Sequence, residues 1–228
     1  MVIVAHPDDA EYGCAGTVAK WASEGKEIIY VLCTSGDKGT GDVNVSPAAL
    51  AEVRREEQEN ACRVLGVSEV VFLGYEDGVL TNTIGLRRDI VRQIRQFRPD
   101  AVICQDPTSR WSAQQYINHP DHRAAGDAAL DAVYPSARDP HVFSELRAEG
   151  LEPHKVREVY IMSRDSAEVW IDISKTIDRK IAALLEHKSQ MRGRPNEEIE
   201  NRIREGAKGA VDGHDMEYAE TFKYIKLR

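Results

Sequence analysis

Near its start the sequence reads Val2-Ile3-Val4-Ala5-His6-Pro7-Asp8-Asp9-Ala10-Glu11, and this stretch decides how the rest of the chain is interpreted. The apolar run 2–4 is typical of a short buried strand, and a histidine and three acidic residues follow where that strand should end. In an open parallel sheet, ligands bind in the crevice beyond the carboxyl ends of the strands. We therefore expect a functional site at this edge of a sheet.

The residue types in this stretch suit a metal ion. His6 and Asp9 offer a nitrogen and an oxygen ligand three residues apart. A catalytic zinc site usually takes three protein ligands and a water, so the missing ligand should lie elsewhere. The best candidate is in a second dense cluster, Asn118-His119-Pro120-Asp121-His122. On a helix His119 and His122 would share one face, so we expect His122 to complete the metal site. His119 would lie beside it, where a protonated imidazole could stabilise an oxyanion.

Asp8 and Asp9 are adjacent, so their side chains should point in different directions. One can bind the metal while the other faces a metal-bound water. Zinc lowers the pKa of such a water to roughly 7, and a nearby carboxylate can then accept its proton. The alternatives are a solvated turn with a capping aspartate for the first cluster and, for the second, a helix N-terminus capped by Asn118 with His122 packed behind it. Together the clusters favour a metal site, because they supply complementary parts of it.

The composition is that of an ordinary globular protein. The 228-residue chain has a net charge of −8, and 42% of its residues are hydrophobic. We expect one domain over residues 1–228. The negative charge argues against nucleic-acid and membrane-surface partners, because phosphate groups demand basic patches. No run approaches the ~20 apolar residues of a membrane span, so we expect no membrane insertion. The four cysteines have no paired spacing, which indicates free thiols and a cytoplasmic protein.

Strand-like and helix-like segments alternate along the chain. We predict strands over residues 2–5, 27–33, 69–73, 100–104, 156–162 and 168–173, and a return of residues 218–227 to the sheet. We predict helices from near Glu11 or Cys14 to Ser23, from Ser46-Pro47 to Gly66, and over 86–97, 119–133, 174–187 (capped by Ser174) and 196–208. This alternation predicts an α/β fold, a Rossmann-like three-layer arrangement in which a mostly parallel sheet is flanked by helices.

Some segments lack a clear role. The glycine-rich loop 34–42 lacks the ending of a phosphate-binding P-loop; we expect it to border the site, with an ordinary flexible loop as the alternative. Residues 134–155 show no period, and irregular segments of this length often serve function or cover a site. Four scattered histidines are interpreted as surface or packing residues: His141, His154, His187 and His214.

The two histidine motifs in this order resemble the zinc-dependent de-N-acetylase family called LmbE-like or PIG-L. Weaker resemblance runs through Arg54-x-x-Glu57-x-x-x-Ala61-x-x-x-Leu65-Gly66, the Asp77-Gly78 pair and Tyr218-Ala219-Glu220-x-Phe222, so it covers essentially the whole chain. Members of this family remove acetyl groups from N-acetylglucosamine units of conjugates and related small molecules.

The resemblance implies a role for each matching residue. Zinc would be bound by His6, Asp9 and His122. Asp8 would be the general base that later returns its proton to the leaving amine, and His119 would stabilise the oxyanion. Substrate binding would involve three more residues: Arg54, Asp77 and Tyr116. In some members a tyrosine stands directly before the second motif, whereas here Ile117 lies between Tyr116 and that motif.

The resemblance thus predicts a metal-dependent N-deacetylase that releases acetate and a free amine from a small amino-sugar substrate. Two alternatives stay open: an amidase that cleaves a larger acyl group from an amino-sugar thiol conjugate, and a non-catalytic zinc-containing binding protein of the same fold. A nucleotide-binding Rossmann domain is disfavoured because the phosphate fingerprint is absent. Zn²⁺ is the expected metal, although other divalent ions suit two imidazoles and a carboxylate. Related proteins suggest a homo-oligomer, a trimer or hexamer.

Overall fold

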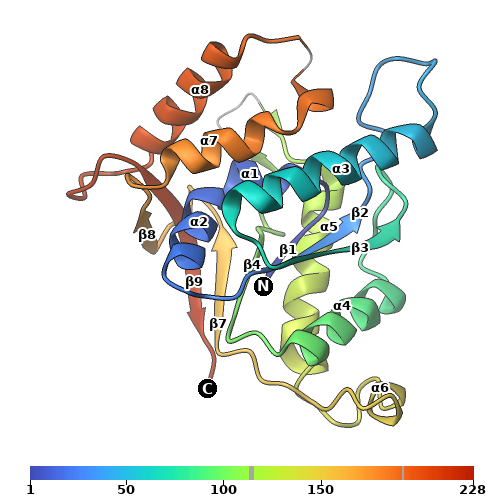
Figure 1. Ribbon diagram of the computed structural model, residues 1–228. Helices are drawn as coiled ribbons and strands as arrows, with labels where there is room; N and C mark the ends of the chain where they lie inside the picture. The colour runs from blue at the N-terminus through green and yellow to red at the C-terminus, as the bar shows by residue number, and fades with distance from the viewer. Residues whose placement is uncertain (113–115, 192) are drawn as a thin grey trace.

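The computed structural model describes residues 1–112, 116–191 and 193–228, without the side chains of Ser112 and Tyr116. Within them the main sheet has seven strands in the order β3-β2-β1-β4-β7-β9-β8, and a separate hairpin pairs β5 with β6 (Figure 1). The strands are β1 (Val2–Val4), β2 (Ile29–Thr34), β3 (Glu69–Tyr75), β4 (Ala101–Gln105), β5 (Trp111–Ser112), β6 (Tyr116–Ile117), β7 (Glu158–Met162), β8 (Val169–Asp172) and β9 (Ala219–Lys226). The helices are α1 (Asp9–Gly13), α2 (Ala15–Ser23), α3 (Pro47–Leu65), α4 (Ile84–Phe97), α5 (Pro120–Asp131), α6 (Glu145–Ala148), α7 (Ile177–Leu185) and α8 (Asn196–Lys208), with a π-helical turn η1 (Ala132–Ser136) and a 3₁₀ turn η2 (Lys188–Gln190).

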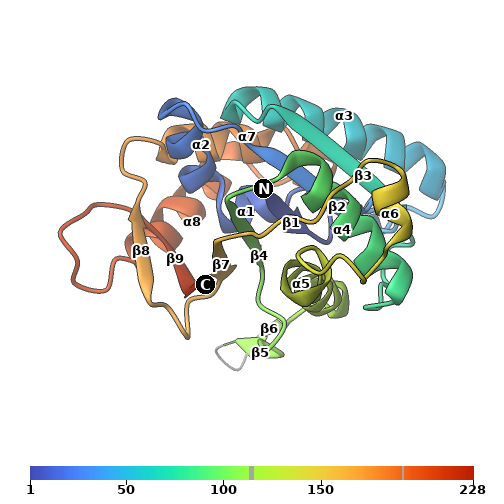
Figure 2. The same cartoon turned by 90° about the horizontal axis from the view of Figure 1, so that it is seen from below.

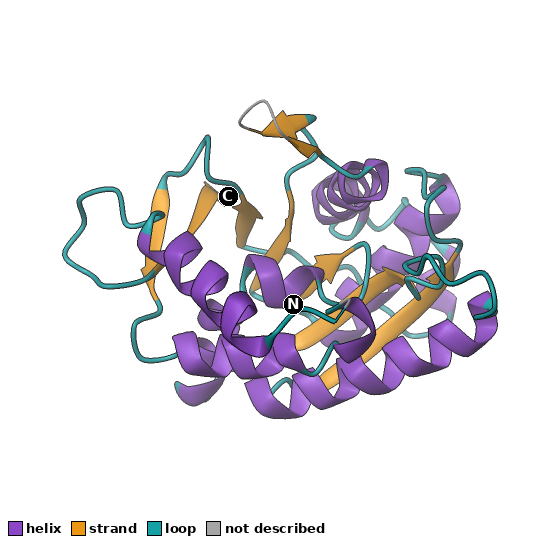
Figure 3. Cartoon of the chain, turned by 90° about the horizontal axis from the view of Figure 1, so that it is seen from above, coloured by secondary structure: helices purple, strands orange, loops and turns teal. Residues whose placement is uncertain are grey.

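The predicted fold class is confirmed. Strands β3, β2, β1, β4 and β7 run parallel, whereas β9 runs antiparallel to both β7 and β8. All six residues of β2 are buried, as expected for a parallel strand that is covered on both faces. Figures 2 and 3 show helices on either side of the sheet.

The three layers follow from the alternation of side chains along each strand. Ile3 and Val31 point to the core shared with α4 and α5, where Ile90 and Ala125 are fully buried. Their neighbours Val4 and Leu32 point to the opposite core, where Val18 of α2 and Leu65 of α3 pack. A third, smaller cluster holds α8 against α7 through residues such as Ile181 and Ile199.

Local signals explain most helix ends. Ser46 accepts a hydrogen bond from the Ala49 N–H at 3.2 Å, and Gly66 ends α3 at a φ of 81°, so both predicted ends of this helix are confirmed. The predicted Ser174 cap is wrong, because Thr176 occupies the N-cap position of α7. The Ser174 hydroxyl instead donates to Asp172 and accepts from two N–H groups just before β9.

The segment 134–155 is organised by a buried arginine. The Arg95 guanidinium, in the last turn of α4, donates to the carbonyl oxygens of five residues: Ser136, Ala137, Asp139, Val142 and Phe143. Since α4 leads into the amino end of β4, this segment lies at the opposite edge of the sheet from the predicted site (Figure 1). It therefore does not cover that site.

All four cysteines are free, as predicted, and all four are buried. In the described part of the chain, no helix combines the length and the apolar character needed to cross a membrane.

Candidate active site

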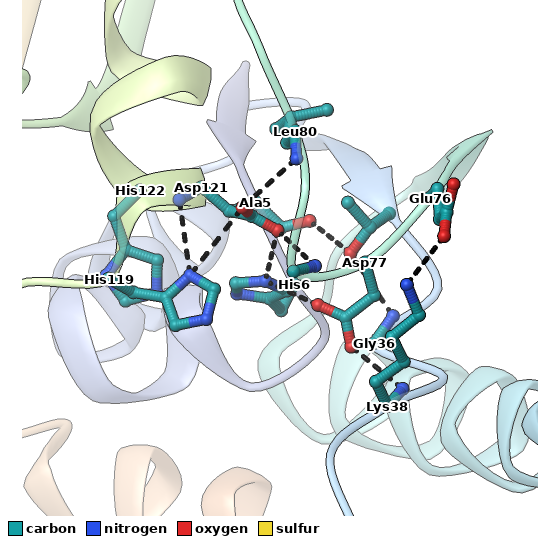
Figure 4. A network of polar contacts seen from close by, with 12 residues as sticks. Ala5, His6, Gly36, Lys38, Glu76, Asp77, Leu80, His119, Asp121 and His122 are labelled. Atoms are coloured by element: carbon teal, nitrogen blue, oxygen red, sulfur yellow. Dashed lines mark hydrogen bonds and ion pairs between the residues drawn. The ribbon is translucent and has the colours of Figure 1, made fainter.

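The two predicted clusters meet at the carboxyl edge of the sheet. His6 follows β1, and the chain beyond the neighbouring strand β4 passes through the β5–β6 hairpin to His119, the N-cap residue of α5. The ring centroid of His6 lies 4.8 Å from that of His119 and 5.3 Å from that of His122. Figure 4 shows the three imidazoles side by side, with His6 between the α5 histidines and Asp77.

The predicted metal ligands present their donor atoms to one another. His122 Nε2 lies 3.0 Å from Asp9 Oδ1, and His6 Nδ1 lies 3.3 Å from Asp9 Oδ2. Zinc bonds of about 2.0–2.2 Å in a tetrahedral site place neighbouring ligand atoms roughly 3.3 Å apart. Ring nitrogens of His6, His119 and His122 also come within 4.8 Å of one another. The residues present therefore fit a divalent cation.

Buried carboxylates fix the orientation of the His6 ring. Its Nε2 lies 3.0 Å from Asp77 Oδ1 and 3.3 Å from Asp121 Oδ2. The Asp121 carboxylate in turn accepts hydrogen bonds from the N–H groups of Gly78 and Leu80. Nε2 therefore carries a hydrogen, and the Nδ1 lone pair is available to a cation held beside the Asp9 carboxylate. Metal-bound histidines commonly donate their other ring N–H to a carboxylate in this way.

These three buried groups, His6, Asp77 and Asp121, are also close enough together to hold a cation themselves. The carboxylate of Asp121 already accepts two backbone hydrogen bonds, however. The Nδ1 side of His6 is the better metal site, because only there does a second imidazole, His122, join the carboxylate of Asp9.

His122 is oriented by an amide. Its Nδ1 lies 3.1 Å from Asn118 Oδ1, and Asn118 Nδ2 donates to the Ser109 carbonyl at 2.8 Å. The second bond sets which end of the amide faces the ring, because only the amide nitrogen can donate. His122 Nδ1 therefore carries the hydrogen, and Nε2 is left to bind a metal.

The site strongly favours positive charge. Burial alone would lower the pKa of His6, but the carboxylates of Asp9, Asp121 and Asp77 raise it to about 12. Burial alone would raise the pKa of Asp9, but His122 and His6 hold it well below its usual range. A proton or a metal ion at the imidazoles satisfies the same carboxylates.

The Asp8 carboxylate has a cationic partner of its own. Its Oδ2 lies 3.3 Å from Arg54 Nη2. Burial raises the pKa of Asp8 to about 6, although the nearby Arg54 charge opposes the rise. A general base works best when its pKa is near the working pH. Asp8 is therefore suited to accept and return a proton.

His119 differs from its expected protonation state. Its Nδ1 accepts the Asp121 N–H at 3.2 Å, which requires a lone pair on that nitrogen and leaves the hydrogen of the neutral ring on Nε2. Burial and the neighbouring His6 lower the pKa of His119. A neutral ring can still donate from Nε2, so a positive charge is not needed for oxyanion binding.

The residues expected to bind substrate lie deeper than anticipated. Arg54 is 4% exposed and donates to the carbonyl oxygens of Pro7 and Gly36. Asp77 is 5% exposed and accepts the Lys38 N–H in addition to contacting His6. Both therefore hold the loop 34–42 against the site, which confirms that this loop borders it. The side chain of Tyr116 lies outside the described part of the structure.

Several buried polar residues behind the site were not predicted. Gln58, Glu11 and His187 are fully buried and contact one another on the Asp8 side of the site. On the α3 helix, Gln58 lies four residues after Arg54 and four before Cys62. This four-residue spacing puts Gln58 on the same helix face as Arg54 and Cys62, and it was the sequence pattern from which its burial could have been predicted.

Comparison with known proteins identifies relatives of this chain. A family model described as PIG-L, GlcNAc-PI de-N-acetylase, matches residues 1–133, which is more than half of the chain. The chain belongs to the PIG-L family. The predicted resemblance is thereby confirmed, and with it the prediction of a deacetylase that acts on N-acetylglucosamine-type sugars.

Individual PIG-L relatives cover most of the chain. The diacetylchitobiose deacetylase of Thermococcus kodakarensis is 34% identical over 227 residues, 99% of this chain and 82% of the relative. A 1D-myo-inositol 2-acetamido-2-deoxy-α-D-glucopyranoside deacetylase of Saccharopolyspora erythraea is 34% identical over 72% of this chain and 64% of its own. The solved N,N′-diacetylchitobiose deacetylase of Pyrococcus horikoshii, complexed with its inhibitor, superposes with a TM-score of 0.87 at 31% identity, covering 97% of this chain and 81% of the other.

Proposed function

We propose that this PIG-L family member hydrolyses the N-acetyl group of a short chito-oligosaccharide at the site formed by His6, Asp9 and His122, with Asp8 as the general base. The observation that carries the proposal is the pairing of one carboxylate, Asp9, with two imidazoles while its neighbour Asp8 stays apart from them. Metal binding alone would not need Asp8, so its placement supports catalysis over a purely binding role.

The metal would be held by His6 Nδ1, the Asp9 carboxylate and His122 Nε2. A bound divalent cation supplies an acidified water near neutral pH and polarises the acetyl carbonyl. The buried carboxylates around His6 favour a cation at this place.

The side chains of the protein account for the proton movements. Asp8 accepts a proton from the attacking water, and the new C–O bond forms as the carbonyl oxygen gains negative charge. His119 Nε2–H donates a hydrogen bond to that oxygen. When the C–N bond breaks, Asp8 gives its proton to the departing nitrogen, so acetate and a free amine result. Arg54 holds the Asp8 carboxylate through its Nη2 contact.

The choice of substrate is supported by the relatives. The Thermococcus kodakarensis and Pyrococcus horikoshii deacetylases, which match nearly the whole chain, are named for diacetylchitobiose. The depth of Arg54 and Asp77 suits indirect roles, in which they shape the sugar pocket through the loop 34–42. Tyr116 remains a proposed sugar contact.

The finer predictions complete the proposal. The native metal is Zn²⁺, the protein is cytoplasmic, and it assembles as a trimer or hexamer without nucleic-acid or membrane partners. Buried free thiols support a reducing compartment. A single domain over residues 1–228 is supported by a sheet whose strands run from Val2 to Lys226.

The deciding experiment measures acetate release by zinc-loaded protein from diacetylchitobiose and other N-acetylglucosamine conjugates. Asp8→Asn should retain zinc but lose at least about 100-fold in kcat, because general base catalysis contributes 10²–10⁴-fold. Asp178→Asn, at an exposed carboxylate on α7, is the matched control and should keep wild-type activity. Appreciable turnover by Asp8→Asn would exclude Asp8 as the base. No release from any conjugate by zinc-bound protein would favour a larger-acyl amidase or a binding protein.

A further inference from the structure

Asp8 has an unusual backbone for its residue type. Its φ is 83° and its ψ is −23°, in the left-handed region that residues with a Cβ rarely adopt. Such a conformation persists only where surrounding contacts hold it. Because the backbone of a residue sets the direction of its Cβ, the contacts that hold this backbone help to place the carboxylate of the proposed base.

A buried glutamine supplies one of these contacts. The Asp8 N–H donates to Gln58 Oε1 at 3.2 Å, and Gln58 is fully buried on α3. The Gln58 amide can accept this hydrogen bond only when its oxygen faces Asp8, because the Asp8 N–H is a donor and an amide NH₂ group cannot accept. A reversed amide would place its NH₂ group against the Asp8 N–H.

A second buried pair keeps the amide in that orientation. Gln58 Nε2 donates to Glu11 Oε1 at 3.1 Å, and Glu11 Oε2 lies 3.3 Å from His187 Nε2. Glu11 and His187 are also fully buried. The carboxylate would repel the amide oxygen if the amide reversed, and His187, which precedes η2, compensates the buried charge of Glu11.

We propose that Gln58, Glu11 and His187 form a buried chain that positions the catalytic base, with Gln58 holding the Asp8 backbone and Glu11 and His187 orienting Gln58. This inference rests on the proposed function, in which Asp8 is the base. None of the three touches the substrate, so they are positioning residues. The chain links α1, α3 and the segment after α7 to a single peptide group.

The test compares three variants with the wild type in steady-state kinetics. Gln58→Leu removes the acceptor and should lower kcat about 10- to 100-fold with KM and zinc content unchanged, since small displacements of catalytic groups have effects of this size. Glu11→Gln keeps the shape but no longer dictates the amide orientation, so it should lower kcat by a smaller factor. The double variant should lie close to Gln58→Leu alone, because the hydrogen bonds through Gln58 are the route by which Glu11 positions the Asp8 backbone.

The matched control is Gln93→Leu, which removes another buried glutamine, on α4 and away from this chain of contacts, and should leave kcat unchanged. Multiplying effects in the double variant, or wild-type kcat in Gln58→Leu, would overturn the positioning role. If Gln58→Leu does not fold, Glu11→Gln decides: reduced kcat with intact zinc content supports the role, and wild-type kcat overturns it. An inactive wild type or an active Asp8→Asn would instead refute the proposed function, and this inference with it.

Discussion

At the scale of single residues, the same carboxylate group serves different purposes according to what surrounds it. Asp9 lies between two imidazoles, Asp121 joins His6 to two backbone N–H groups, and Asp8 faces an arginine. The partners therefore assign the chemistry: Asp9 suits a metal, Asp121 an orienting contact and Asp8 proton transfer.

The amide of Asn118 provides a test of this view. Asn118→Ala removes the acceptor for His122 Nδ1 and should weaken zinc affinity about 10- to 100-fold, as expected for a partner that orients a metal ligand. Competition with a chelator measures the affinity. Asn82→Ala, which removes an amide bonded to Asp131 at the far end of α5, is the control and should bind zinc normally. Equal affinities of the two variants would contradict the orienting role.

The sequence pointed to the proposed metal ligands more readily than to the residues that surround them. His6, Asp9 and His122 could be named because two short motifs carry them. The helical spacing of Gln58 indicates a buried position on α3, and Glu11 stands in the first motif, but the sequence does not show that these two residues contact each other. Their function depends on contacts between segments far apart in the chain, which no local pattern encodes.

At the scale of elements, the close packing of α5 on β4 sets the position of both site histidines. A Cβ on Gly126 would lie 2.4 Å from the Gln105 carbonyl oxygen, which is backbone and cannot move aside easily. The absence of a side chain therefore lets α5 approach the sheet where it must deliver His119 and His122.

Gly126→Ala should consequently harm both stability and metal binding. We expect the free energy of unfolding, measured by urea titration, to fall by about 1–3 kcal/mol because the added methyl overpacks the contact. Zinc affinity should fall as well, since α5 has to shift. Gly206→Ala on α8 is the control: no neighbouring atom lies within 4 Å of the added Cβ, so helix propensity should raise stability by about 0.5–1 kcal/mol. Wild-type stability in Gly126→Ala would refute this account of the packing.

Element boundaries were predictable where capping chemistry marks them. Ser46 and Gly66 delimit α3, and α8 spans the predicted residues 196–208. The β5–β6 hairpin was missed because each strand has only two residues, too few for a periodic pattern. Of the two predicted starts for the first helix, Cys14 is the N-cap residue of α2, whereas Glu11 lies in the separate short helix α1, which ends at Gly13 and was not predicted.

At the scale of the whole molecule, one buried ion pair joins the first and last parts of the chain. Lys180 Nζ lies 2.6 Å from Glu220 Oε1 and donates to the Tyr12 carbonyl at 2.7 Å. Glu220 also accepts the N–H groups of Gly16 and Thr17 at the start of α2. Glu220 in β9 thus contacts both the start of α2 and Lys180 of α7.

Removing one member of this pair should destabilise the fold strongly. Glu220→Gln leaves the Lys180 charge buried without its partner, and we expect the free energy of unfolding to fall by about 3–5 kcal/mol. Combining it with Lys180→Met should recover part of the loss, because no unpaired charge remains. Glu168→Gln, at an exposed partner of Lys223, should change stability by less than about 1 kcal/mol. Unchanged urea unfolding of Glu220→Gln would contradict the proposed importance of the pair.

The layered architecture followed from the alternation of strands and helices, but the strand order did not. The return of residues 218–227 to the sheet was predicted, whereas its position between β7 and β8 was not. The local sequence pattern of β9 does not predict which strands it pairs with, because strand pairing depends on the packing of segments that are distant in the sequence.

The interior position of β9 has a consequence during synthesis. Among the described strands, β8 pairs with β9 alone. Residues 169–172 therefore leave the ribosome before their pairing partner, residues 219–226, has been synthesised. The parallel half, from β3 to β7, can form its hydrogen bonds before then. At about 5–20 residues per second, synthesis of the intervening chain takes roughly 3 to 10 seconds. During that interval β7 and β8 expose unpaired edges, and the nascent chain is most open to chaperones and to misassembly with its neighbours.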